Sequence, residues 1–228
     1  MSEACWVGAE PDTVWRVSEA GDAFRVLAPS GVGPGVLVLH SSWGLTNGIR
    51  DYCRELSNAG YTVIAPDLLD GSTATSIEQA QHLLEEVDPN RLSVLVQAGA
   101  RALYQAGKDA DAKMTVIGFG MGGSLSFWAA ARLATIFDRS VSYCGSQSID
   151  FAAAEGPFLG HFGALDALVS EDDRTYTESL IRLGGNDATF HVYEGATSGF
   201  AEPGHLAYRP GDAAIAMERT LEFLAAGR

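Results

Sequence analysis

Short apolar runs alternate along the chain with longer segments whose apolar residues recur at helical spacing. The run GVLVLH, residues 35–40, is nearly continuous in apolar character, which is typical of a strand in a parallel sheet covered on both faces. Residues 50–59 follow as an amphipathic helix that ends at Gly60. The same alternation predicts strands at residues 61–65, 115–118, 140–145, 158–162 and 189–194, and helices at residues 76–87, 90–106, 124–133, 171–183 and 210–226.

This order of elements predicts a mostly parallel, doubly wound α/β sheet, preceded by an extended segment over residues 13–28. With 228 residues, of which 46% are hydrophobic, the chain is long enough to bury a sizeable core. Neither a linker nor an internal repeat divides it. We therefore expect a single domain that spans residues 1–228.

The charge of the chain narrows the classes of partner. It carries 15 Lys and Arg against 29 Asp and Glu, a formal charge of −14, which repels phosphate backbones and anionic membranes. No run approaches the roughly 18 apolar residues of a membrane span, and the start of the chain does not resemble a secretion signal. We expect a cytoplasmic protein, a monomer or a homodimer, that binds neither nucleic acid nor membranes.

Cysteine spacing and ligand motifs argue against a metal or a disulfide framework. The cysteines, Cys5, Cys53 and Cys144, are odd in number, widely spaced and without a CxxC pair. No HExxH motif or similar pairing of His with carboxylates appears. We expect reduced thiols, no metal and no cofactor.

The segment MTVIGFGMGG, residues 114–123, is the most informative about chemistry. A β-branched strand runs into a glycine-rich turn and then a helix, which is the setting of a nucleophile elbow; such an elbow holds a Ser or Cys above the sheet. The centre of this turn is Gly120, which has no side chain. Backbone donors can persist without a nucleophile, so we expect the N–H groups of Met121 and Ser42 to form an oxyanion hole.

The same glycines also satisfy the dinucleotide-binding pattern GxGxxG, with Asp138 at the distance of a ribose-binding acid. Asp138 precedes the predicted strand at residues 140–145, whereas a ribose-binding acid lies at the carboxyl end of a strand. The motif also comes midway along the chain instead of opening the fold. The elbow interpretation is therefore preferred.

Four segments together resemble the dienelactone hydrolase family of α/β-hydrolases. They are GVLVLHSSWGLTNGIRDYCRELSNAGYTVIAPDLLDG, VIGFGMGG, FLGHFGALDALV and HVYEGATSGF. Their order and spacing match over roughly residues 34–223. The resemblance implies an α/β-hydrolase fold without a large cap domain, and hydrolysis of an enol lactone or small ester by a Cys-His-Asp triad.

Carried over by position, the resemblance places the nucleophile at Gly120, the histidine at Ser198 and the aspartate at Asp166. It places the family's glutamate, which contacts the resting thiol, at Ser41. The arginines that hold the substrate carboxylate in dienelactone hydrolase itself are not visible, because the corresponding segments read PDLLDGS and GFAEPG. The resemblance thus implies a degenerate triad of which only Asp166 remains.

The remaining candidates have alternative roles. Asp166 is either a general acid or base, or a residue bonded to backbone amides. Ser41 is either a hydroxyl donor or nucleophile, or a group that satisfies nearby backbone. Ser198 is expected to bond to a ligand or to Asp166. Cys144 would need an activating base to act as a nucleophile. His205 is expected at the surface, with the alternative that its loop swings it toward the pocket.

Aromatic residues flank the presumed site and are expected to form a wall for a flat ligand. They are Trp43, Phe119, Tyr143 and Phe200.

Three functions remain open. The first is a small-molecule enzyme that uses non-covalent, oxyanion-hole chemistry on an enol, lactone or polyketide-like substrate. The second is an inactive protein that binds a ligand or partner. The third is hydrolysis by a water molecule in place of the thiol.

Overall fold

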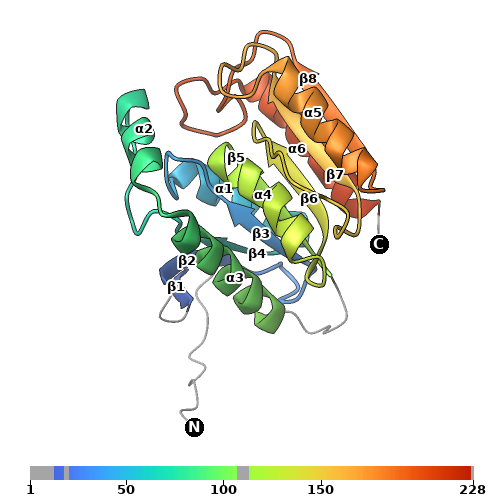
Figure 1. Ribbon diagram of the computed structural model, residues 1–228. Helices are drawn as coiled ribbons and strands as arrows, with labels where there is room; N and C mark the ends of the chain where they lie inside the picture. The colour runs from blue at the N-terminus through green and yellow to red at the C-terminus, as the bar shows by residue number, and fades with distance from the viewer. Residues whose placement is uncertain (1–12, 18–20, 107–112, 227–228) are drawn as a thin grey trace.

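The computed structural model describes residues 13–17, 21–106 and 113–226, and Cys5 lies outside them. Its eight strands form one sheet in the order β1-β2-β4-β3-β5-β6-β7-β8 (Figure 1). β2 is antiparallel to both β1 and β4, and every other pair is parallel. The predicted mostly parallel α/β sheet is confirmed.

The strands are β1 (Thr13–Val17), β2 (Gly21–Val26), β3 (Gly35–Leu39), β4 (Thr62–Pro66), β5 (Met114–Phe119), β6 (Phe137–Tyr143), β7 (Phe158–Gly163) and β8 (Ala188–Tyr193). The helices are α1 (Asn47–Asn58), α2 (Ile77–Glu86), α3 (Pro89–Ala106), α4 (Met121–Arg132), α5 (Glu171–Leu183) and α6 (Pro210–Ala225).

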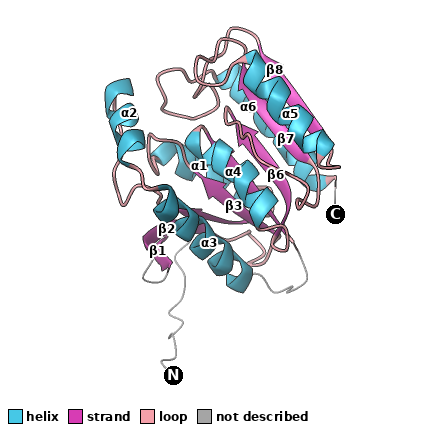
Figure 2. Cartoon of the chain, viewed as in Figure 1, coloured by secondary structure: helices cyan, strands magenta, loops and turns pink. Residues whose placement is uncertain are grey.

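Helices cover both faces of the sheet (Figure 2). One core cluster joins buried residues of α1 and α6, such as Ile49 and Met217, to one face of the strands. A second cluster joins α3, α4 and α5, through residues such as Leu95, Phe127 and Ile181, to the other face. Every residue of β3, β4 and β5 other than Gly35 is buried, which accounts for their apolar runs.

Several element boundaries differ from the sequence prediction. Helix α1 begins at Asn47 instead of residue 50, and β6 covers Phe137–Tyr143 instead of residues 140–145. The extended segment at residues 13–28 forms two strands, β1 and β2, with residues 18–20 outside the described part. Helix α4 begins at Met121 instead of residue 124, because Gly120 itself is the N-cap. Within the described residues, no helix is both long and apolar enough to cross a membrane.

The nucleotide-binding alternative does not fit this arrangement. Asp138 is the second residue of β6, so it lies at the amino end of that strand, while Gly120 follows the carboxyl end of the neighbouring parallel strand β5. The two residues therefore lie at opposite ends of these two parallel strands. A ribose-binding acid would have to share the edge of the glycine turn.

Close backbone approach fixes the turn between β5 and α4. A Cβ at Gly118 would lie 1.8 Å from the Gly122 carbonyl oxygen, and a Cβ at Gly122 would lie 2.2 Å from the Leu39 carbonyl oxygen. On the other side, a Cβ at Gly145 would lie 2.7 Å from the Gly120 oxygen. Any larger side chain at these glycines would push β3, β5, β6 and α4 apart.

These contacts predict different costs for alanine at neighbouring glycines. Gly118→Ala is expected to lower the free energy of unfolding by more than about 3 kcal/mol, because the added Cβ meets backbone that cannot move aside. Gly120→Ala is expected to cost only about 1–2 kcal/mol, for its positive φ, because space surrounds its Cβ. Urea denaturation of both variants measures the difference, and equal losses would contradict this account of the turn.

Candidate functional site

The centre of the turn has the backbone geometry of an elbow. Gly120 has φ 50° and ψ −113°, and its N–H donates to the Tyr143 carbonyl at 2.8 Å. The bond from the Ser124 N–H to the Gly120 carbonyl, 3.1 Å, opens helix α4. The Met121 N–H therefore lies in the first helical turn, which leaves amides without an intrahelical partner at the positive end of the helix dipole. This geometry suits the oxyanion donor that the sequence predicts.

Space remains beside Gly120. Of the described residues outside its immediate neighbours in the chain, the Ser41 Cβ alone comes within 4 Å of an ideal Cβ at this position, at 3.5 Å. Neither the Trp43 ring nor the Phe200 ring comes within 4 Å of that Cβ position. Ser41 lines it instead, from the loop after β3.

A buried carboxylate is bonded to Ser41. The Ser41 hydroxyl donates to Glu202 Oε1 at 3.0 Å and accepts the Trp43 N–H at 3.1 Å. Glu202 is 2% exposed and Ser41 is 6% exposed. Glu202 belongs to the loop between β8 and α6, which comes so close to α1 that a Cβ at Gly48 would lie 1.7 Å from the Pro203 oxygen.

Sequence reasoning missed Glu202. The available signal was an acid in GFAEPG, the segment in which the resemblance leads one to expect an arginine. Burial raises the pKa of the Glu202 carboxyl from 4.5 to about 7, although the bond from the Ser41 hydroxyl acts in the opposite direction. Near neutral pH this group can therefore both accept and release a proton.

A buried histidine fixes the loop that carries Ser41. His40 Nε2 accepts the Leu68 N–H at 2.8 Å, so its proton is on Nδ1, which donates to the Ser41 carbonyl at 2.7 Å. The Ser41 carbonyl also accepts the Gly44 N–H at 3.1 Å. Ser42 lies half-buried within this turn, and its amide stays a predicted oxyanion donor.

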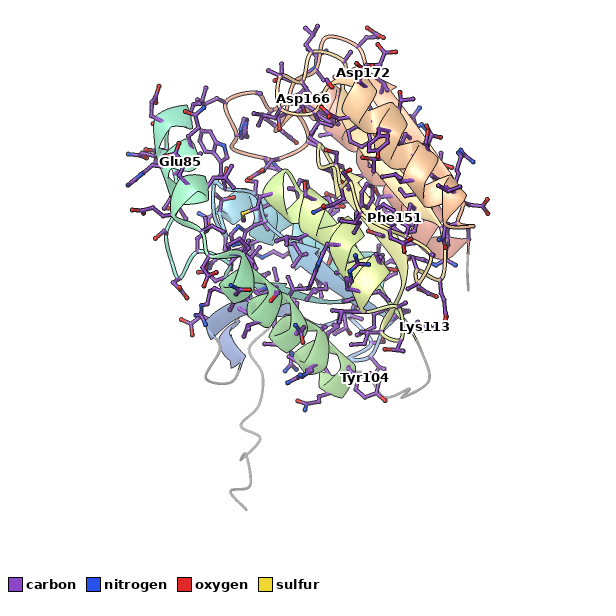
Figure 3. All side chains as sticks on the ribbon, in the orientation of Figure 1. Glu85, Tyr104, Lys113, Phe151, Asp166 and Asp172 are labelled. Atoms are coloured by element: carbon purple, nitrogen blue, oxygen red, sulfur yellow. The ribbon has the colours of Figure 1, made fainter. Side chains whose placement is uncertain are left out.

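Asp166 lies in the loop after β7, at the same end of the molecule as Asp172 (Figure 3). Its Oδ1 accepts the N–H groups of Leu168 and Val169, at 2.8 and 3.3 Å, which is the backbone-bonded alternative. Its Oδ2 is buried without a hydrogen-bond partner. One oxygen of this carboxyl is thus structural, and the other is unused.

Cys144 lies between Asp166 and the elbow. Its neighbours in the chain, Tyr143 and Gly145, both contact Gly120. Burial first, and then the charge of Asp166, raise the pKa of the Cys144 thiol. The thiol therefore stays protonated at neutral pH, and Asp166 does not activate it as a nucleophile.

His205 lies closer to the site than a purely surface position would place it. It is half-buried, its ring packs edge-on against Trp43 at 4.4 Å, and a Cβ at Gly199 would fall 2.4 Å from its ring. His205 Nδ1 accepts the Ala207 N–H at 2.9 Å, and burial lowers the pKa of the imidazole. Ser198, next to Gly199, is half-buried. The predicted bond from Ser198 to Asp166 is not formed, because Asp166 Oδ1 bonds to backbone and Oδ2 has no partner, and a bond to a ligand stays a prediction.

Three of the expected wall residues belong to the core. Phe119 stacks on Tyr143 at 4.5 Å, and the Tyr143 hydroxyl bonds to Thr220 of α6 at 2.7 Å. Phe200 is fully buried and packs against Tyr193 at 4.7 Å. Since these rings fill the layer between the sheet and α6, they offer no open face to a ligand here. Trp43 is half-buried and its N–H bonds to the Ser41 hydroxyl, and its role as a wall for a ligand stays a prediction.

Comparisons with known proteins identify the family of the chain. The model of the dienelactone hydrolase family matches residues 23–227. The chain belongs to this family. Carboxymethylenebutenolidase 1 of Cupriavidus pinatubonensis is 30% identical over 209 residues, 84% of this chain and 86% of the relative. Carboxymethylenebutenolidase of Pseudomonas putida is 29% identical over 213 residues, 84% of this chain and 85% of the relative.

A solved structure supports the fold of this family member. It is a dienelactone hydrolase-like promiscuous phosphotriesterase from metagenomic libraries, with a TM-score of 0.80 at 19% identity, over 94% of this chain and 96% of that one. Within the described residues, no group of three or more His, Cys, Asp or Glu side chains could hold a metal ion.

The buried carboxyl of Glu202 predicts a pH-dependent stability. Its pKa is raised on folding from 4.5 to about 7, so the folded state holds this proton more tightly than the unfolded chain. The resulting stabilisation is fully present below about pH 4.5 and is lost as the pH rises through about 7. Relative to Glu202→Gln, the wild type is expected to lose about 3 kcal/mol of unfolding free energy over that interval.

Urea denaturation at a series of pH values measures this loss. Glu218→Gln, which changes an exposed glutamate of α6, is the control and should keep the wild-type dependence. Wild type and Glu202→Gln with the same pH dependence would show that Glu202 titrates as it does in the unfolded chain.

Proposed function

We propose that this chain is a divergent dienelactone hydrolase that lacks the family's nucleophile and histidine, and that acts on a small enol, lactone or polyketide-like substrate without covalent attachment. The observation that carries the proposal is Gly120. It keeps the backbone conformation of an elbow, with the first amide of α4 beside it, and space lies where a side chain would be. A site reduced to an inert fold would have filled that space.

Backbone donors set the type of reaction. Deleting a nucleophile and its base typically lowers turnover by about 10⁶, so we do not propose triad hydrolysis. Each oxyanion donor is worth about 10²–10³ in rate, and an enolate oxygen accepts the same hydrogen bonds as a tetrahedral oxyanion. Cyclisation, isomerisation or elimination through an enolate would therefore use the Met121 and Ser42 amides.

The names of the relatives support a lactone as the substrate class, since carboxymethylenebutenolidases are named for a butenolide. Binding without turnover and hydrolysis by a site water are the competing functions. We keep the expectation of a cytoplasmic monomer or homodimer whose partner is a small molecule and not nucleic acid or a membrane.

Blocking the space tests where the function resides. Gly120→Leu is expected to abolish binding of α-angelica lactone, an uncharged enol lactone, followed by saturation-transfer NMR. Its melting temperature should fall by only a few degrees, because the cost is the positive φ of about 1–2 kcal/mol. Gly120→Ala, which adds one carbon beside Ser41, is the matched control and should retain binding. Unchanged binding by Gly120→Leu would move the ligand site elsewhere.

A further inference from the structure

The carboxylate and hydroxyl beside Gly120 have the arrangement of a proton relay. We infer that Glu202 is the acid–base group of this site and that the Ser41 hydroxyl carries the proton between Glu202 and a substrate held beside Gly120. The inference rests on the proposed function, to which it adds the group that moves the proton and the class of substrate.

The hydrogen bonds of Ser41 give the relay its direction. The hydroxyl has one proton to donate, which goes to Glu202 Oε1 at 3.0 Å. One lone pair accepts the Trp43 N–H at 3.1 Å, and the other stays available for a proton from the substrate. Because the Ser41 Cβ lies 3.5 Å from the Cβ position of Gly120, this side chain borders the proposed ligand space.

The surroundings of Glu202 favour proton exchange near neutrality. Within the described residues, burial and the Ser41 hydroxyl are the influences that set its pKa, at about 7. His205 donates its backbone N–H to the Glu202 carbonyl at 3.0 Å, while its ring faces Trp43 and Gly199.

Other titratable groups lie on the elements packed around the loop that carries Glu202. His40 is next to Ser41, and its ring nitrogens bond to the Ser41 carbonyl and the Leu68 N–H. Cys144 faces Gly199 from the end of β6, and Asp166 faces Cys144 from the loop after β7. Among these groups His205 is the competing candidate for a titration near neutral pH, so the test includes it.

The step balances without a co-reactant. A C–H bond next to the substrate carbonyl breaks, and its proton goes to the Ser41 oxygen as the Ser41 proton goes to the Glu202 carboxylate. The electron pair of the C–H bond moves onto the carbonyl oxygen, which the backbone donors hold as an enolate. Return of the proton to another carbon of the conjugated system releases an isomer and restores both residues.

The carboxylates near the site narrow the class of substrate. Glu202 and Asp166 bring two buried acids to this edge of the sheet. A substrate carboxylate would be repelled here, because like charges in a low-dielectric site disfavour each other. The structure therefore points to an uncharged carbonyl compound with a C–H bond acidified by conjugation.

The experiment measures deuterium exchange and isomerisation of α-angelica lactone in D₂O by NMR. In this lactone the methylene next to the carbonyl loses a proton, and protonation at the carbon that bears the methyl group gives the conjugated isomer; hydrolysis gives levulinic acid. The wild type should catalyse exchange, and its rate should rise with pH to a plateau above about 7, where Glu202 is ionised. Glu202→Gln and Ser41→Ala should each lower the rate by about 100-fold or more while lactone binding persists.

Matched variants separate the outcomes. Glu218→Gln, on the exposed face of α6, should leave rate and midpoint unchanged, and His205→Gln should keep the midpoint. Exchange that survives in Glu202→Gln, or a midpoint that moves with His205→Gln, would overturn the relay and leave the proposed function standing. No exchange above the Glu202→Gln rate would also overturn the relay. Levulinic acid as the wild-type product would overturn both the relay and the proposed non-hydrolytic function. If the wild type did not bind the lactone, the proposed function itself would be contradicted.

Discussion

The site depends on the glycine-to-backbone contacts that join β3, β5, β6 and α4. Gly118, Gly122 and Gly145 each bring backbone atoms closer than any side chain would permit. This packing holds the Met121 amide at the start of α4 without help from a nucleophile at position 120. The elbow conformation of this turn is consequently a property of the backbone and does not require a side chain at position 120.

The two buried carboxyl groups of the site, Glu202 and Asp166, differ in what they bond to. The resemblance assigns the family's glutamate to position 41, which here is Ser41, yet a carboxylate still reaches this point because Glu202 enters from the loop between β8 and α6. Burial of that loop gives Glu202 a proton affinity suited to neutral pH. In Asp166, by contrast, one carboxyl oxygen accepts hydrogen bonds from backbone N–H groups of its own loop.

The sheet and its helices were predictable because local patterns determine them. The apolar runs of β3, β4 and β5 follow from burial on both faces, and the parallel order follows from the intervening helices. The start of α4 was misplaced because a positive φ at Gly120 serves as the N-cap, and sequence periodicity carries no sign of it. A helix start that depends on such a cap can be located only when the backbone dihedral angles are known.

Site residues were predictable only where a motif fixed them. Gly120 and Ser41 come from segments with recognisable spacing, whereas Glu202 reaches the site through a hydrogen bond with a residue 161 positions away. Phe119 and Tyr143 were expected at a ligand wall because they flank the elbow in sequence. Their side chains instead face the layer under α6, a direction that only the register of β5 and β6 determines.

The central claim is that the backbone of a hydrolase site persists around different reactive groups, and restoring those groups tests it directly. The measurement is hydrolysis of an activated ester by the double variant Gly120→Cys with Ser198→His, beside each single variant. If the elbow, the backbone donors and Asp166 are in place, the double variant gains hydrolysis and iodoacetamide labelling at position 120, and each single variant gains far less. A folded double variant with no hydrolysis above the parent would contradict the claim.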